Sequence, residues 1–387
     1  MKNKKICIFT GSRADFGLLS RVIQLIKKDS SLKLQIVAGG SHFLRRHGFT
    51  YREIIENGFK IDKKIKFNIK SYSSKNITKA TGHALNYLSD AYKSLRPDII
   101  VVLGDRYEVF AASYAALINQ IPLAHFHGGE LTEGAIDDSL RHAITKMAHI
   151  HFVASRTYYK RVIQLGENKK NVHIIGGLGV DNIINTNFLK KKYIEKKLNF
   201  KFGKKNLLIT FHPETINDQK NLIFQFGNLL KALDQFKDIK CIFTKPNVDI
   251  FSDLICSMID KYVKKNKNRC VSFKSMGQQF YLSTLKNMDA VVGNSSSGLL
   301  EAPTLKIGTI NIGIRQNGRL KSDSIIDCDS KVKSISNSIR KLYNSNFKKK
   351  IMKTKNLYGF PGGAKKALKV LKNTKLDNIL IKKFIDV

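Results

Sequence analysis

The sequence contains no tryptophan, only five cysteines, and no apolar run long enough to span a membrane. The cysteines form no Cys-x-x-Cys pair and their number is odd, which argues against a disulfide framework or a zinc site and for a reducing compartment. The basic N-terminus is followed by a single short apolar run, residues 6–9, which is too brief for a signal peptide. These absences predict a cytoplasmic globular protein with no membrane partner.

Acidic residues are also scarce. Lys and Arg number 68 against 30 Asp and Glu, which gives a formal net charge of +38. Such an excess can indicate a nucleic-acid or anionic-membrane binder. Here, however, lysine dominates and is spread along the chain, and no segment interleaves arginines with aromatic residues as nucleic-acid-reading domains do. We therefore expect no nucleic-acid partner, although the charge favours an anionic small molecule as ligand.

What the sequence does contain is an alternation of short apolar runs with longer amphipathic stretches. With 387 residues, 42% of them hydrophobic, the chain is long enough for two domains. Continuous β-branched runs are typical of parallel strands covered on both faces, so the alternation predicts doubly wound α/β domains. The predicted strands are residues 5–9, 33–38, 98–103, 122–127, 149–154 and 172–175 and, after a break, 206–211, 239–243, 270–273, 290–292 and 309–312.

The break between the two series lies at Gly176, Gly177 and Gly179, which precede a polar stretch. We expect an N-terminal Rossmann-like domain over residues 1–178, a C-terminal one over 179–362, and a helical tail over 363–387 that crosses back to the first domain. Ligands of open parallel sheets bind outside the carboxyl ends of the strands. The segments after the strands are therefore the candidate site, which we expect in the cleft between the domains.

Two such segments of the first domain follow separate strands. Residues 11–17 (GSRADFG) open a helix, and its N-terminal N–H groups together with Arg13 could hold a phosphate. The plainer alternative is a capped turn with a surface arginine. Asp105 directly follows another buried strand, where it serves either as a functional carboxylate in the cleft or as a helix N-cap.

The segment HFHGGE, residues 125–130, ends the next predicted strand. Two histidines at i and i+2 share one face of a strand, so His125 and His127 raise the alternative of a metal site. No third ligand with matching spacing accompanies them, and we expect no metal. A polar catalytic pocket that contains His127, Glu130 and Asp137 fits the pattern better. Asp137 could instead cap the following helix or pair with Arg141 at i,i+4.

The second domain carries two further segments. His212 lies where a strand ends beside a proline. Residues 293–298 (GNSSSG) follow another strand and open a helix, so hydroxyl and N–H groups could together cradle a diphosphate. Glu301 lies about one turn further, where it could accept hydrogen bonds from both ribose hydroxyls; a serine-rich helix cap is the alternative.

At these residues the sequence resembles the hydrolysing UDP-N-acetylglucosamine 2-epimerases of sialic and legionaminic acid synthesis. The resemblance covers nearly the whole chain and implies a GT-B-like fold, no cofactor, a nucleotide-sugar substrate, and a homo-oligomer, either dimer or tetramer. UDP and an N-acetylmannosamine-type sugar would be the products. The matching stretches are residues 11–17, 103–108, 125–147, 211–213, 246–249, 293–303 and 315–320.

The resemblance also implies roles for single residues. The reaction removes a weakly acidic C2 proton, which requires a positioned base and stabilisation of the leaving group. Asp105 and Asp137 would be the acid/base carboxylates, and His212 would serve the diphosphate or the leaving oxygen. The implied substrate- and nucleotide-binding residues are Arg13, Arg106, Asn247, Ser296, Ser297, Gly298, Glu301 (to the ribose) and Arg319.

The HFHGGE motif departs from the pattern of some members, which carry a catalytic glutamate where this chain has His127. Either His127 or Glu130 would then take over the proton transfer. The H-x-H-G-G-E form resembles the branch that acts on a 2,4-diacetamido-6-deoxy sugar. We expect UDP-N-acetylglucosamine as substrate, with UDP- or GDP-N,N'-diacetylbacillosamine as the alternative. A non-hydrolysing epimerase and a GT-B glycosyltransferase are further alternatives, over which the paired Asp105 and Asp137 favour the hydrolysing epimerase.

Overall fold

The computed structural model describes residues 3–67, 69, 71, 73–133, 135–214, 219–246, 251–359 and 361–386. The chain divides into two compact units. Unit 1 comprises Met1–Glu130, Ile136–Ile184 and Tyr358–Val387, and unit 2 comprises Leu131–Ala135 and Asn185–Leu357. The boundaries expected at residues 178 and 362 both fall inside stretches of unit 1.

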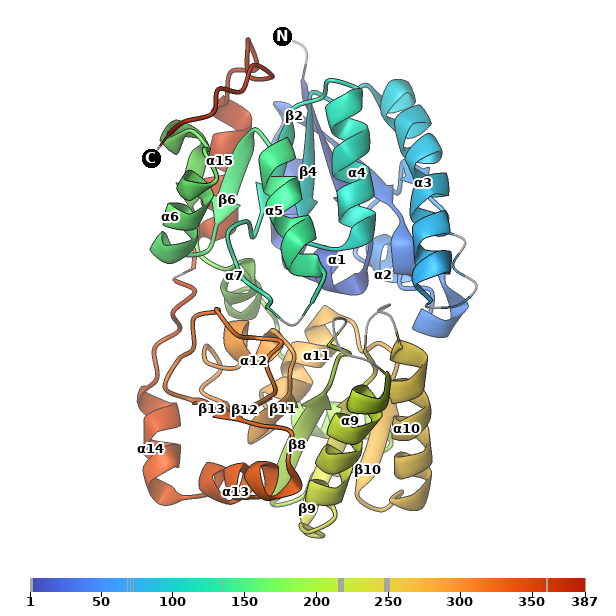
Figure 1. Ribbon diagram of the computed structural model, residues 1–387, viewed down its shortest axis with the longest axis vertical. Helices are drawn as coiled ribbons and strands as arrows, with labels where there is room; N and C mark the ends of the chain where they lie inside the picture. The colour runs from blue at the N-terminus through green and yellow to red at the C-terminus, as the bar shows by residue number, and fades with distance from the viewer. Residues whose placement is uncertain are drawn as a thin grey trace. The chain divides into compact units, whose positions relative to one another are not determined.

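Unit 1 is built on a parallel seven-stranded sheet with the strand order β3-β2-β1-β4-β5-β6-β7 (Figure 1). Its strands are β1 (Lys4–Thr10), β2 (Leu32–Ala38), β3 (Lys63–Lys64), β4 (Ile99–Leu103), β5 (Leu123–Phe126), β6 (Ile150–Val153) and β7 (Val172–Ile174). Its α-helices are α1 (Arg13–Lys28), α2 (Tyr51–Glu56), α3 (Ser74–Leu95), α4 (Tyr107–Ile118), α5 (Asp137–Met147), α6 (Arg156–Gln164), α7 (Leu178–Ile184) and α15 (Gly363–Asn373). Short 3₁₀ turns lie at Gly40–Phe43, Arg45–His47 and Lys169–Asn171.

The strand order of unit 1 reverses between β1 and β4, which pair in parallel with Ile6 opposite Ile99. This reversal is the switch point at which ligands of doubly wound sheets bind. Gly11 follows β1 and Gly104 follows β4, so the chain segments after these two strands both begin at the switch point. The residues predicted to act on the sugar follow β4 and β5. They therefore lie at the carboxyl ends of the strands, where this fold binds its ligands.

The last helix of the chain, α15, completes the core of unit 1 (Figure 1, red). Ala364, Ala367 and Leu371 are buried in the same cluster as the strands and α1. The carboxylate of Asp181, in α7, accepts hydrogen bonds from the N–H groups of Gly362 and Ala364 and so caps α15. These contacts attach α7 to unit 1 beyond the expected boundary at residue 178.

Unit 2 has a parallel six-stranded sheet with the order β10-β9-β8-β11-β12-β13 and its own switch point between β8 and β11. Its strands are β8 (Lys205–Thr210), β9 (Ile239–Thr244), β10 (Cys270–Phe273), β11 (Ala290–Gly293), β12 (Gly308–Ile312) and β13 (Ile325–Cys328). Its helices are α8 (Lys191–Leu198), α9 (Gln219–Leu233), α10 (Ser252–Lys265), α11 (Gln278–Leu285), α12 (Ser297–Leu300), α13 (Val332–Leu342) and α14 (Ser345–Lys353).

Every strand that the apolar runs predict is present, and the predicted class of two parallel-sheet α/β domains is confirmed. Two edge strands were not predicted. β3 consists of two lysines, and β13 is short and half-buried, so neither carries the continuous apolar run of a central strand. The predicted strand 122–127 is one residue too long at each end; after Phe126 the backbone turns at His127, which has the left-handed conformation.

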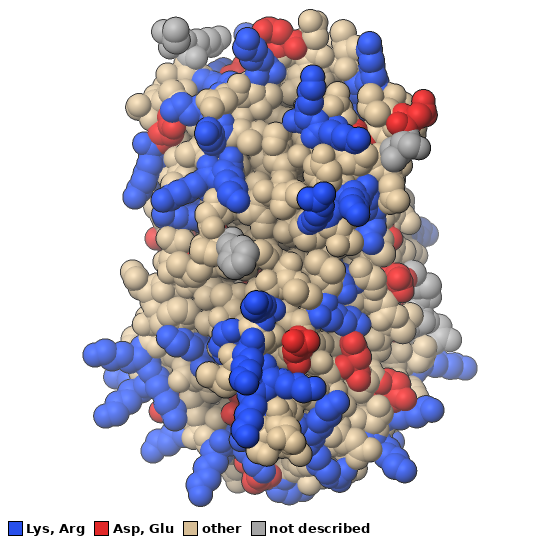
Figure 2. Space-filling model, turned by 90° about the vertical axis from the view of Figure 1, so that its left-hand side faces the viewer, with Lys and Arg blue, Asp and Glu red and all other residues tan. Residues whose placement is uncertain are grey.

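The surface reflects the composition. Lys and Arg side chains are spread over the face that Figure 2 displays, with fewer acidic side chains between them. Within the described ranges, no helix combines the length and the apolar character that crossing a bilayer requires.

Candidate active site

The HFHGGE motif forms a sharp turn where β5 ends. His127 has φ of 65° and Gly129 has φ of 75°, both in the left-handed region. A Cβ on Gly129 would lie 2.5 Å from the carbonyl oxygen of Tyr158, so only glycine fits there. A left-handed histidine costs about 1–3 kcal/mol and is held only where its surroundings demand it, often at a functional site.

The turn brings His127 and Glu130 together. Nδ1 of His127 lies 2.6 Å from Oε1 of Glu130, and both side chains are buried. Nε2 of His127 is buried and has no hydrogen-bond partner among the described residues. A carboxylate that accepts from Nδ1–H fixes the ring and its tautomer, which leaves Nε2 as the nitrogen able to exchange a proton with a ligand.

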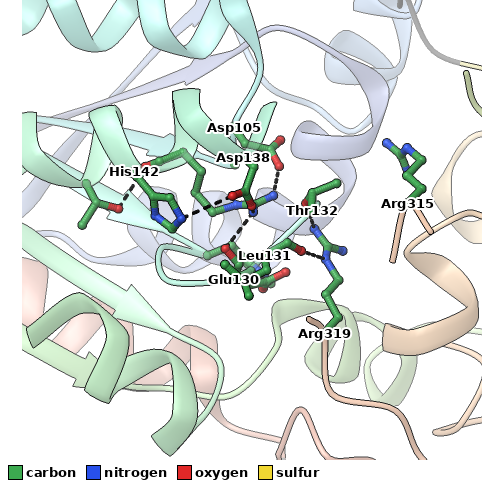
Figure 3. Close-up of polar contacts among 12 residues, drawn as sticks. Asp105, Glu130, Leu131, Thr132, Asp138, His142, Arg315 and Arg319 are labelled. Carbon is green, nitrogen blue, oxygen red and sulfur yellow. Dashed lines mark hydrogen bonds and ion pairs between the residues drawn. The ribbon is translucent and has the colours of Figure 1, made fainter. Parts of the chain in front are cut away.

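A second carboxylate is held by a buried arginine (Figure 3). Arg141, on α5, is only 1% exposed, and its guanidinium bonds the carboxylate of Asp105. The same guanidinium donates to the carbonyl of Glu130 at 2.8 Å and to Oδ1 of Asp138 at 3.3 Å. Arg141 therefore orients Asp105, after β4, and anchors the backbone of Glu130, after β5. The alternative reading of Asp105 as a helix N-cap is wrong, because the N-cap of α4 is Arg106.

Asp137 lies in the first turn of α5, next to Asp138. The N-cap of this helix is Ile136, so the capping role considered for Asp137 is not the one the structure shows. A negative charge in the first turn is nevertheless favourable to the helix dipole. α5 thus carries Asp137, Asp138 and Arg141 on its N-terminal half, directly after the HFHGGE turn.

Two backbone amides that precede α1, in the turn after β1, are hydrogen-bonded within the turn itself. The carboxylate of Asp15 accepts hydrogen bonds from the N–H groups of Gly11 and Ser12, both at 2.7 Å. This carboxylate takes the place that a bound phosphate would have on those two amides. Arg13 is the first residue of α1 and is half-buried.

Arg106 is engaged within unit 1. Its Nε donates to Oε1 of Glu108 at 2.9 Å. Glu108 is fully buried, burial raises the pKa of its carboxyl, and its Oε2 has no partner among the described residues. A Cβ on Gly11 would lie 2.3 Å from Cγ of Glu108, which explains the glycine at that position.

The alternative of a metal bound by His125 and His127 fails on geometry. Both ring nitrogens of His125 are already used, with Nδ1 3.2 Å from Oγ1 of Thr145 and Nε2 2.8 Å from the carbonyl of Gly104. Burial lowers the pKa of His125 to about 3, so the ring is neutral. Across the described part of the chain, no group of three or more His, Cys, Asp or Glu side chains could hold a metal ion.

In unit 2, His212 and the GNSSSG turn are joined through Asn294. Oδ1 of Asn294 accepts from the N–H of His212 at 2.7 Å, and its Nδ2 donates to the His212 carbonyl at 2.8 Å. Asn294 is completely buried. The backbone of His212, after β8, is therefore fixed to the turn after β11, at the switch point of this sheet.

The turn itself is shaped by two glycines. Gly293 has φ of 135°, and a Cβ on it would lie 2.0 Å from the carbonyl oxygen of Thr210. A Cβ on Gly298 would lie 2.5 Å from Cγ2 of Thr309, so Gly298 has a packing reason beside its expected role at the nucleotide. Oγ of Ser297 is 2.5 Å from the hydroxyl of Tyr281 on α11.

The other expected nucleotide residues lie around this turn or outside the described residues. Ser296 is the N-cap of the single-turn helix α12, and Glu301 directly follows that helix. Because α12 is so short, it offers N–H groups and hydroxyls and only a small dipole. Asn247 lies outside the described residues. Arg319 is engaged by the backbone of Leu131 and by Thr132.

Residues 24–372 match the model of the UDP-N-acetylglucosamine 2-epimerase family. The chain belongs to this family. The resemblance seen in the sequence is thereby confirmed, and the HFHGGE turn, Asp105 and the GNSSSG turn all lie within the matched region.

Three relatives align with almost the whole chain. The GDP/UDP-N,N'-diacetylbacillosamine 2-epimerase (hydrolyzing) of Campylobacter jejuni is 44% identical and covers 100% of both chains. The polysialic acid biosynthesis protein P7 of Escherichia coli is 35% identical and covers 99% of this chain and 98% of its own. The UDP-N,N'-diacetylbacillosamine 2-epimerase (hydrolyzing) of Legionella pneumophila is 32% identical and covers 98% of both.

Solved epimerase structures share the fold. The UDP-GlcNAc 2-epimerase of Neisseria meningitidis bound to UDP-GlcNAc superposes with a TM-score of 0.79 at 16% identity, covering 96% of this chain and 100% of that one. A putative UDP-N-acetylglucosamine 2-epimerase from Listeria monocytogenes gives 0.79 at 16% identity, with 96% of each chain covered. These likenesses confirm the GT-B-like fold expected of the epimerase family.

The sequence did not reveal the two residues, Arg141 and Asn294, that hold other residues of the candidate site in place. Arg141 was noted only as a helix partner of Asp137, and Asn294 only as part of a turn. The available signal was an arginine on the helix that directly follows the HFHGGE motif; the structure buries this side chain, and a buried arginine must be paired with acceptors. Arg141 and Asn294 each orient a side chain or backbone segment from a different strand end.

Proposed function

We propose that this protein is a hydrolysing 2-epimerase that converts a nucleoside-diphosphate 2-acetamido sugar into the free nucleotide and the C2-inverted free sugar. The observation that carries the proposal is the His127–Glu130 pair, with Nδ1 held by a carboxylate and Nε2 buried without a partner among the described residues. This pair stands where part of the family carries a glutamate, and an oriented imidazole can perform the same proton transfer.

The proposed reaction has two stages. In the first, a base removes the proton from C2, the C1=C2 bond forms, and the C1–O bond breaks as the nucleotide leaves with its electron pair. In the second, hydroxide from water adds to C1 of the glycal and a proton returns to C2 on the opposite face. Because the proton leaves and returns on different faces, two acid/base groups are needed. We assign His127 to one face and Asp105 to the other, with Asp137 as a further acid/base carboxylate.

The nucleotide is proposed to bind unit 2. Ser296, Ser297 and Glu301 lie at the turn after β11, where hydroxyls and N–H groups suit a diphosphate and a ribose. The backbone of His212 is held beside this turn by Asn294, and we assign the His212 side chain to the diphosphate or the leaving oxygen. Arg13 in unit 1 remains a proposed phosphate ligand through its own side chain.

The proposed sugar is N,N'-diacetylbacillosamine carried on UDP or GDP. Two of the relatives that cover nearly the whole chain bear names for this substrate, at 44% and 32% identity. UDP-N-acetylglucosamine, which we expected first, becomes the second candidate. It is supported by the name of a Neisseria meningitidis relative, which is 29% identical and covers 87% of this chain.

Incubation in deuterium oxide separates the candidates. The protein is given UDP-N,N'-diacetylbacillosamine, its GDP form, or UDP-N-acetylglucosamine, and products are followed by mass spectrometry and NMR. Free nucleotide with a C2-inverted sugar that carries deuterium at C2 would support the proposal and identify the substrate. A nucleotide-bound epimer would instead indicate a non-hydrolysing enzyme. If all three compounds stay intact, the proposal is refuted.

A pair of variants tests the residue assignment. Glu130→Gln keeps a hydrogen-bonding side chain but removes the carboxylate that fixes His127, and His127→Asn removes the imidazole ring. Each is expected to lower kcat by about 10²- to 10⁴-fold, since that is the usual contribution of general acid–base catalysis. Wild-type turnover in His127→Asn would remove this side chain from the mechanism.

A further inference from the structure

The chain passes from unit 1 into unit 2 directly after Glu130. Glu130 and Ile136 are part of unit 1, whereas the described residues between them, Leu131–Glu133 and Ala135, belong to unit 2. We call Leu131–Glu133, the described residues that directly follow Glu130, the strap. It follows Glu130 directly in the chain, so its position constrains Glu130 through a peptide bond.

Arg319 holds the start of the strap (Figure 3). Its Nε donates to the carbonyl of Leu131 at 2.8 Å, and its Nη2 lies 3.1 Å from Oγ1 of Thr132. Two donors of one rigid guanidinium fix both the place and the direction of this backbone. The residue before it, Gly318, has φ of 75°, and a Cβ there would lie 2.5 Å from Cδ1 of Leu131. The loop that contains Gly318 and Arg319 is therefore in close contact with the strap.

The loop that carries Arg319 is also bonded to the proposed nucleotide turn. The carbonyl of Asn294 accepts from Nη1 of Arg315 at 3.1 Å and from Nε2 of Gln316 at 2.8 Å. Gln316 and Asn294 are both completely buried. The N–H of Arg319 in turn points to the carbonyl of Gln316 at 3.4 Å. The turn after β11, this loop and the strap thus form one continuous set of contacts inside unit 2.

We infer that Arg319 is a positioning residue that links the nucleotide turn to the acid/base pair through the strap. The inference rests on the proposed function and replaces the substrate- or nucleotide-binding role that the family resemblance implied for Arg319. Glu130 is joined to Leu131 by a peptide bond, and its carboxylate orients His127. A strap released by loss of Arg319 shifts Glu130 and with it the ring of His127. Displacements of about 1 Å lower rates by about 100-fold in well-oriented sites.

Three variants test the role of Arg319 against a nucleotide-binding role. Arg319→Met removes both donors, Arg319→Lys keeps the charge but loses the fork, and Thr132→Val removes one acceptor. We expect Arg319→Met to lower kcat by about 10- to 100-fold while the affinity for UDP, measured by calorimetry, stays within about twofold. Arg319→Lys should recover part of kcat, and Thr132→Val should lose less than Arg319→Met. Arg340→Met, an exposed arginine on α13, is the matched control and should leave both quantities unchanged.

Hydrogen exchange measures the link without turnover. UDP should increase the protection of the strap amides in the wild-type protein and should do so less in Arg319→Met. A fall in UDP affinity that matches the fall in kcat would make Arg319 a nucleotide ligand and overturn the inference, as would an unchanged kcat. If the wild-type protein releases no nucleotide from any of the three sugars, the proposed function fails, yet the effect of UDP on strap protection still decides whether the link exists.

Discussion

At the scale of single residues, the candidate site consists of reactive groups held by buried partners. His127 is held by Glu130, Asp105 by Arg141, and the backbone of His212 by Asn294. Each partner is buried and contributes either a charged hydrogen bond or, in the case of Asn294, two hydrogen bonds. Buried hydrogen bonds of this kind are strong and costly to lose. Substitutions of the partners should therefore affect stability as well as turnover, whereas substitutions of the reactive groups should affect turnover first.

Asp105→Asn should abolish measurable turnover and leave UDP binding intact. The amide keeps the shape of the side chain but cannot take up a proton, which removes about 10²- to 10⁴-fold in rate. It also leaves the buried guanidinium of Arg141 with less compensating charge, so a modest fall in melting temperature is expected. Asp138→Asn, on the same guanidinium, serves as control and should melt similarly but keep most of its turnover. Wild-type-like rates in Asp105→Asn would exclude it as an acid/base group.

Buried histidines should make the protein sensitive to acid. The ring of His42 is fully buried between the hydroxyls of Thr10 and Thr50, each at 2.9 Å, and burial lowers its pKa to about 4. Above pH 6.5 both the folded and unfolded states hold the neutral ring, so the shift has no effect. Between pH 6.5 and 4 the unfolded state binds the proton and the folded state does not, so the free energy of unfolding falls by about 1.4 kcal/mol per pH unit.

His42→Gln tests this titration, since glutamine can bond the same hydroxyls but does not titrate. Denaturant unfolding between pH 7 and 4.5 should show a shallower loss of stability in the variant than in the wild type. Part of the acid sensitivity should remain, because burial also lowers the pKa of His125 and His151. An identical slope in both proteins would contradict the assignment to His42.

At the scale of elements, the turn after β11 that carries the proposed nucleotide residues has a backbone that only certain residues allow. β11 ends in Gly293, where φ of 135° and the close approach of Thr210 exclude a side chain. α12 then begins at Ser297 and packs through Gly298 against β12. The hydroxyls of the turn are therefore placed by the sheet and by the packing of one short helix.

Gly293→Ala should both destabilise unit 2 and weaken UDP binding. The added Cβ would meet the carbonyl of Thr210 at 2.0 Å in a conformation that alanine avoids, so the turn must shift by more than a rotamer change. We expect a loss of several kcal/mol in stability, as for other strained core substitutions, and at least a tenfold loss of UDP affinity by calorimetry.

Gly82→Ala is the matched control for this substitution. Gly82 lies inside α3, and a Cβ there would have no neighbour within 4 Å. Alanine is the better helix former, so the variant should be more stable by about 0.5–1 kcal/mol with unchanged UDP affinity. Equal UDP affinity in Gly293→Ala would place the nucleotide away from this turn.

At the scale of the whole molecule, each unit contains segments that are not consecutive in the chain. The C-terminal helix α15 belongs to the core of unit 1, and the strap, which follows β5 of unit 1, belongs to unit 2. The stability of unit 1, which contains most of the N-terminal half of the chain, therefore depends on residues near the C-terminus of the protein. Each unit has a separate buried cluster, so each should respond separately to a core substitution.

Leu371→Ala should destabilise unit 1 and leave unit 2 unaffected. Leu371 is completely buried in the cluster of unit 1, and removing such a side chain costs about 2–5 kcal/mol. Hydrogen exchange should show faster exchange in β1, α1 and α15. Leu342→Ala, buried in the cluster of unit 2, is the matched control and should change the exchange of β12 and α13 instead. Uniform acceleration across both units in either variant would contradict two separate cores.

The amino-acid sequence by itself determined every strand except the edge strands β3 and β13, the two-domain class, and the position of Asp105, His127 and His212 after strands. These features depend on local periodicity and on turn chemistry, which are read over a few residues. The tertiary structure alone decided the partners. Arg141 meets Asp105 only because β4 and β5 lie side by side, Asp15 takes the amides at Gly11 and Ser12, and Arg319 reaches the strap from a distant loop. Such pairings depend on how the chain returns to a sheet, and this information is not contained in any one segment.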